Sequence, residues 1–163
     1  MLYLSMKSMQ LLPNGLGGTM MAFDWLHGKV SEDMVPKLGF PAWFPTALGL
    51  FKLMQASLNW IAGGKYVPIA QYLFAFQLGG AIFAHAIIEK KLPSCVPCAV
   101  FFANGLAVHV LHGSAMSLPM VVVSHTLLAI LGFLMGFVIV GLGSGAKKAV
   151  ALSPVKFRKA RGF

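Results

Sequence analysis

Two cysteines separated by two residues are the side chains of this sequence best suited to redox chemistry. Cys95 and Cys98 form a C-x-x-C pair directly before an apolar stretch, and a thiolate at the start of a helix is stabilised by the helix dipole. The chain has no other cysteine, so no second pair can reload the first. Redox chemistry therefore competes with a passive pair or a structural disulfide. Two thiols alone are too few ligands for a structural zinc ion.

Histidines form a second set of residues with possible chemistry. The four that fall within or beside apolar stretches are His85, His109, His112 and His125. His109 and His112 share one helix face, because residues three apart lie on the same side. In a membrane, imidazole can be an axial ligand of haem iron or chlorophyll magnesium, or it can hydrogen-bond between helices. The usual Cys, Asp or Glu companions of a metal site are missing, so we expect no metal centre.

Lys52 stands near the middle of an apolar stretch. A charge in that position costs about 2.5–3.5 kcal/mol on membrane-insertion scales. Gln55 and Asn59 follow three and seven residues later and extend a polar stripe along one helix face. We expect the stripe to face other helices, a bound ligand or a partner subunit. The alternatives for Lys52 are a ligand or headgroup contact, or an amine satisfied by backbone carbonyls, Gln77 or Asn104.

The elements that carry these residues are apolar and long enough to indicate a membrane protein. Hydrophobic residues make up 58% of the chain and charged residues 10%, and the mean hydropathy is +0.78. A soluble domain carries roughly 25% charged residues, and a spanning helix needs about 20 mostly apolar ones. The predicted spans are residues 43–61, 67–88, 97–112 and 119–142.

Residues 2–26 are apolar in bulk but contain Pro13 and several polar side chains. We interpret them as a further span that is kinked or covered by neighbours; a surface-lying segment is the alternative. The predicted fold class is all-α, a polytopic bundle of four to five transmembrane helices. It forms a single membrane domain over residues 1–146, followed by a basic tail over 147–163.

Basic residues are distributed unevenly between the two predicted membrane sides. With five crossings, ten lie on one side: Lys29, Lys37, Lys90, Lys91, Lys147, Lys148, Lys156, Arg158, Lys159 and Arg161. Two, Lys7 and Lys65, lie on the other. By the positive-inside rule the C-terminus faces cytoplasm, stroma or matrix. We attribute the net charge of +9 to topology and anionic lipid and expect no nucleic-acid partner. The membrane is organellar inner, thylakoid or bacterial plasma membrane.

Glycines at helical spacing predict close helix packing. Gly132 and Gly136 form a G-x-x-x-G in the last span, and Gly79 and Gly80 are adjacent in the third. Small residues let backbones approach closely inside a membrane. The expected neighbour of Gly132 and Gly136 is the helix over 97–112 or a separate subunit.

Short motifs in the first two thirds of the chain resemble a known family. Residues 37–41 read KLGFP, 49–58 read GLFKLMQASL, and 81–86 read AIFAHA before a proline-containing turn at 91–93. Over residues 10–112 the chain resembles the DoxX-like membrane proteins. The resemblance implies a four-helix plan and a quinone- or thiol-linked role. Lys52 stands where the family usually has Glu, which argues against a role that needs that carboxylate, and 119–142 adds a helix to the plan.

Three functions follow as hypotheses. The first is a non-catalytic accessory subunit of a photosynthetic or respiratory membrane complex, packing against partner helices, lipids, and chlorophyll or carotenoid. The second is a DoxX-like quinone- or thiol-linked redox protein using Cys95 and Cys98. The third is a small carrier or transporter. The sequence shows no nucleotide-binding loop and no Ser-His-Asp set with suitable placement, which favours a role other than an enzyme.

We expect the connection over 90–91 and the C-terminal tail to lie on one side of the membrane. Cysteine reporters at Ser94 and Ser153, in a chain whose Cys95 and Cys98 are replaced by serine, should both react with a membrane-impermeant maleimide from that side. The physical reason is the shared basic charge of the two segments. Opposite accessibility of the two reporters would contradict this topology.

Overall fold

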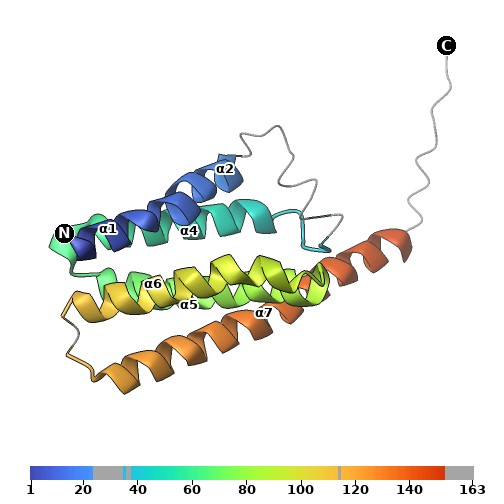
Figure 1. Ribbon diagram of the computed structural model, residues 1–163. Coiled ribbons are helices and arrows are strands. Elements are labelled where there is room, and N and C mark those ends of the chain that lie inside the picture. Colours follow the sequence, from blue (N-terminus) through green and yellow to red (C-terminus); the bar gives the residue numbers. More distant parts are fainter. Residues whose placement is uncertain (24–34, 36–37, 114, 153–163) are drawn as a thin grey trace, which may run out of the picture.

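The computed structural model describes residues 1–23, 35, 38–113 and 115–152, with side chains described as far as Ser144 (Figure 1). These residues form helices and turns and contain no strand, which confirms the predicted all-α bundle. The main helices are α1 (Leu2–Met9), α2 (Gly17–Phe23), α4 (Phe44–Trp60), α5 (Val67–Phe83), α6 (Val96–Leu111) and α7 (Leu118–Leu152). A π-helical turn, Leu11–Leu16, joins α1 to α2, and another, Ala84–Ile88, extends α5. Short 3₁₀ turns, Ala62–Gly64 and Leu92–Cys95, precede α5 and α6.

Within the described residues, three helices are long and apolar enough to cross a membrane. They are Val67–Ile88, Leu92–Leu111 and Leu118–Ser144, with 22, 20 and 27 residues. The chain is therefore an integral membrane protein. The sequence predicts a span over residues 97–112. In the structure the 3₁₀ turn before α6 makes this span longer, and it covers Leu92–Leu111. α4 has 17 residues and rises about 25 Å, against a hydrocarbon core of about 30 Å.

The helices form two packed groups (Figure 1). The α1–α2 segment lies on α4, and α5 lies between α4 and the helices α6 and α7. Glycine lets α2 and α4 meet at their backbones. A Cβ added at Gly18 would lie 2.9 Å from Lys52 Cβ and 3.1 Å from the Gly49 carbonyl oxygen, and a Cβ at Gly49 would overlap the Ala22 backbone. Lys52 of α4 therefore lies directly against α2.

The glycines of α5 and α7 bring these two helices together. A Cβ at Gly79 would overlap the Ala129 backbone, and a Cβ at Gly132 would overlap the Phe76 carbonyl. Gly136 lies against the Phe83 ring. The neighbour of the G-x-x-x-G is thus α5 of the same chain, rather than the helix over 97–112 or a separate subunit.

The connection before α4 lies against the far end of α7. A Cβ at Gly143 would overlap the Gly39 carbonyl and lie 3.1 Å from the Pro41 nitrogen. The connection between α5 and α6 lies at this same end of the bundle (Figure 1). Residues 39–41, the connection between α5 and α6 and the last turns of α7 therefore lie at one end of the bundle.

Replacing Gly132 and Gly136 together with Leu should destabilise the protein by about 1–3 kcal/mol or more, because the new side chains would push α7 away from α5. Thermal unfolding in detergent measures the loss. Gly141→Leu is the matched control on the same helix, because no atom lies within 4 Å of a Cβ there. Equal melting temperatures for the double variant and the control would contradict the packing.

Candidate functional site

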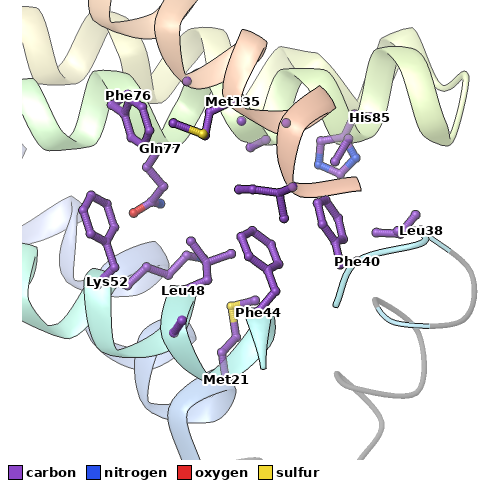
Figure 2. Close-up of a pocket in the computed structure, with 18 of the residues that line it drawn as sticks. Met21, Leu38, Phe40, Phe44, Leu48, Lys52, Phe76, Gln77, His85 and Met135 are labelled. Atoms are coloured by element: carbon purple, nitrogen blue, oxygen red, sulfur yellow. The ribbon is translucent and has the colours of Figure 1, made fainter. Parts of the chain in front are cut away.

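A pocket of about 440 Å³ opens between the two helical groups. Its walls come from α2, α4, α5, α7 and the connection before α4, and they are mostly apolar and aromatic. Its volume is in the range of about 300–1,000 Å³ that is typical of small-molecule sites. Figure 2 shows Lys52 and Gln77 at one end of the pocket and His85 at the other. The pocket therefore has an apolar middle and two polar ends.

The inner polar end combines a cation with an unused acceptor. No hydrogen bond or ion pair joins the Lys52 ammonium to another residue in the part of the chain that the structure describes. Gln77 Nε2 donates to Asn14 Oδ1 at 3.3 Å, while Gln77 Oε1 is buried with no partner among the described residues. An unpaired charge and an unpaired carbonyl in a low-dielectric setting are both costly. This end of the pocket thus presents a positive charge and an acceptor to whatever occupies it.

The other polar end is an imidazole–carboxylate pair. His85 Nδ1 lies 2.8 Å from Glu89 Oε2, one helical turn further along. Both residues line the pocket, and their side chains are 34% and 28% exposed. The pair lies at the end of the α5 span that leads into the connection to α6.

The three residues of the polar stripe predicted on α4 lie in two different environments. Lys52 lines the pocket, whereas Gln55 and Asn59 are fully buried inside the bundle. Gln55 Nε2 donates to the Ala70 carbonyl oxygen at 3.3 Å. Gln55 and Asn59 therefore tie α4 to its neighbours and do not belong to the pocket.

Asn59 belongs to a buried network of four side-chain amides from different helical segments. Gln10 Nε2 donates to Gln71 Oε1 at 2.8 Å and to Asn104 Oδ1 at 2.9 Å. Asn59 Nδ2 donates to Gln10 Oε1 at 2.9 Å, and Gln71 Nε2 donates to Asn59 Oδ1 at 2.7 Å. Asn104 Nδ2 reaches the Met6 carbonyl oxygen at 3.1 Å. The network joins the α1–α2 segment to α4, α5 and α6. Gln10 and Gln71 were not predicted to be functional residues. Each is an amide within an apolar segment, and that pattern could have indicated them.

The histidines that share a face of α6 have different partners. His109 is buried, and its ring centre lies 5.0 Å from that of His125 on α7 and 4.9 Å from that of Tyr72 on α5. His112 Nδ1 lies 2.9 Å from the Tyr3 hydroxyl. The structure thus brings the His109 ring against that of His125, while His112 contacts Tyr3 of α1.

The two cysteines lie at the start of α6 as free thiols. Cys95 is half-buried and Cys98 is buried, and Cys98 packs with Phe74 and Leu78 of α5. These cysteines do not line the pocket between the two helical groups. They form a separate feature of the α5–α6 contact.

Comparisons of the chain with protein-family models, with curated proteins and with solved structures find no match. The functional argument therefore rests on the chain's own residues.

Replacing Gln10 with Leu should lower stability by about 1–3 kcal/mol for each amide left unpaired, because Gln10 bonds to three other buried amides. Thermal unfolding in detergent measures the change. Ser57→Ala is the control, since the Ser57 hydroxyl is exposed and bonds only to its own helix at Leu53. A Gln10→Leu variant as stable as this control would show that the network does not hold the helices together.

Proposed function

We propose that this membrane protein binds a lipid-like molecule with a carboxylate head in the pocket between its helical groups. The observation that carries the proposal is Lys52, an amine without a partner among the described residues, at the inner end of a mostly apolar pocket. A carboxylate placed beside Lys52 would neutralise a charge that is costly in a membrane. A charge-assisted hydrogen bond between the two is stronger than one between neutral groups.

The apolar middle of the pocket suits a chain rather than a compact polar ligand. Phe44, Leu48, Phe76 and Met135 are among its walls (Figure 2). Methionine is flexible and fills irregular space, so a wall of this kind adapts to a methylene chain. Each methylene group buried there contributes about 0.8 kcal/mol, which supports binding of an acyl chain from the surrounding lipid.

The number of crossings bears on where the ligand enters. Residues 2–23 are helical almost throughout and rise about 33 Å, and α4 lies against them through Gly18 and Gly49. Both segments are proposed as crossings, which makes five. The basic connections and tail then face cytoplasm, stroma or matrix, as the positive-inside rule requires. The His85–Glu89 end of the pocket opens toward that side.

An accessory role in a larger membrane assembly is a second candidate, favoured by α7. Only 17% of its apolar window is buried inside the chain, against 50% for the window of α5. A surface of this kind is covered by lipid or by partner helices. Cross-linking from α7 in native membranes distinguishes the two coverings. The DoxX-like, quinone-linked alternative rests on the sequence motifs, and a quinone would place a carbonyl rather than a carboxylate at Lys52.

Lys52→Met tests the proposed ligand. The wild-type protein in nanodiscs should bind palmitate at least about tenfold more tightly than methyl palmitate, a difference of about 1.4 kcal/mol, because only the acid carries a charge. Displacement of a fluorescent fatty acid measures both affinities. The variant should lose this preference and keep its fold, since the substitution removes a buried charge.

Lys65→Met is the matched control, because Lys65 is exposed beyond the end of α4 and does not line the pocket. It should keep the preference for the acid. If the Lys52→Met variant still preferred palmitate over methyl palmitate, the assignment of a carboxylate ligand would be contradicted. Tighter binding of a short-chain ubiquinone analogue than of palmitate would favour the quinone alternative instead.

A further inference from the structure

The pocket between the two helical groups has a second polar end, which a carboxylate at Lys52 leaves unused. This end is formed by His85 and Glu89, which lie four residues apart and both line the pocket. His85 Nδ1 lies 2.8 Å from Glu89 Oε2. Figure 2 shows His85 across the apolar middle of the pocket from Lys52 and Gln77. A molecule that fills the pocket therefore meets a polar group at each of its two ends.

The Glu89 carboxylate determines which atom His85 presents to a ligand. A carboxylate only accepts hydrogen bonds, so His85 Nδ1 carries a proton and donates to it. Nε2 is the ring nitrogen that remains, and no other described side chain bonds to it. Nε2 accepts a hydrogen bond when the ring is neutral and donates one when the ring is protonated. A hydroxyl group suits both states because it can donate and accept, whereas a second carboxylate would lie beside the charge of Glu89.

The spacing of the two polar ends sets the length of a ligand that reaches both. Phe51 of α4 and Phe76 of α5 pack edge to face with ring centres 6.3 Å apart. The residues that follow them, Lys52 and Gln77, are therefore level with each other in the bundle. His85 follows Gln77 by eight residues on a continuous helical segment, a rise of about 12 Å. An extended hydrocarbon chain advances about 1.25 Å per carbon, since its bonds of about 1.5 Å run in a zigzag. A chain of about ten carbons therefore covers this spacing.

We propose that the pocket binds a medium-chain fatty acid that carries a hydroxyl group at the end remote from its carboxylate. The assignment depends on the function proposed for the pocket, because it places the carboxylate at Lys52 and the hydroxyl group at His85 Nε2. The methylene groups between them contact the apolar walls. Phe40 stacks on Phe44 with ring centres 4.4 Å apart, and Figure 2 shows Phe40 at the His85 end of the pocket. These rings shield the second contact from water, which strengthens a hydrogen bond.

Binding of 10-hydroxydecanoate and of decanoate to the protein in nanodiscs tests the second contact. Displacement of a fluorescent fatty acid gives both affinities, and their ratio is compared between the wild-type protein and His85→Phe. Because each acid partitions into the lipid equally in both samples, the comparison isolates the contact with the protein. The ratio should favour the hydroxy acid about three- to tenfold more in the wild type, as expected for one hydrogen bond. Equal ratios in the two proteins would overturn the proposal.

A second variant keeps the test decisive if His85→Phe fails to fold. Glu89→Gln removes the like charge that a second carboxylate would meet, so its affinity for decanedioate relative to decanoate should exceed that of the wild type by at least about threefold. An unchanged relative affinity would contradict the placement of the remote end at this pair. His112→Phe is the matched control, since His112 contacts Tyr3 and does not line the pocket. It should keep the wild-type ratios for all three acids.

The length of the chain provides a third comparison. The six carbons of 6-hydroxyhexanoate advance about 7–8 Å, too little to join the two ends. The ratio of its affinity to that of hexanoate should therefore be the same in the wild type and in His85→Phe. A gain from the hydroxyl group as large as that in the ten-carbon acid would overturn the proposed spacing.

Failure of this proposal is distinguishable from failure of the proposed function. If the hydroxyl group gives no gain while Lys52→Met still abolishes the preference for palmitate over methyl palmitate, the carboxylate contact stands and the hydroxyl contact is wrong. If Lys52→Met keeps that preference, both assignments are wrong.

Discussion

The constraint on which this structure depends is the need of every polar side chain in hydrocarbon to find a partner. Water is absent from the bilayer core, so an unpaired amide there costs several kcal/mol. The chain meets this need with Gln10, Asn59, Gln71 and Asn104, which bond to one another across four helical segments. Each amide restricts the rotation of its helix, because a turn about the axis would break its bonds. The glycine contacts between α2 and α4, and between α5 and α7, then bring backbones together in the orientation that the amides select.

Against this satisfied network, the polar groups without partners are informative. Gln77 lines the pocket beside Lys52, and its Oε1 has no partner among the described residues; the same is true of His109 Nδ1 and His125 Nε2. Buried polar groups normally have a partner, and a ligand in the pocket would supply one to Gln77 Oε1, whereas the unpaired Asn14 Nδ2 and Gln55 Oε1 belong to residues that do not line the pocket. The ligand proposed for the pocket therefore follows from the same physical rule that holds the bundle together.

Sequence patterns predicted the helices well because apolar length and helical periodicity are local properties. The last span and the third were located within a few residues. The rotation of each helix about its axis and the depth of each residue in the bundle depend on tertiary packing. They determine which side chains meet at a site. Lys52 and Asn59 lie on nearly the same side of α4 but about 10 Å apart along its axis, so one borders the pocket and the other enters the amide network. The pairing of His109 with His125 required knowing how α6 and α7 turn toward each other. The neighbour of Gly132 proved to be α5 for the same reason, since a small-residue motif predicts close approach without naming the partner.

The position of α5 determines which residues can test these ideas separately. It contacts α4, α6 and α7, and its apolar window is the most buried of the three long ones. Gln77 on this helix faces the pocket, while Tyr72 contacts both imidazoles and Gln71 joins the amide network. A substitution in α5 would therefore disturb packing and binding together, and its effects would not add simply. Lys52 lies on α4, so the pocket can be altered without a substitution in α5.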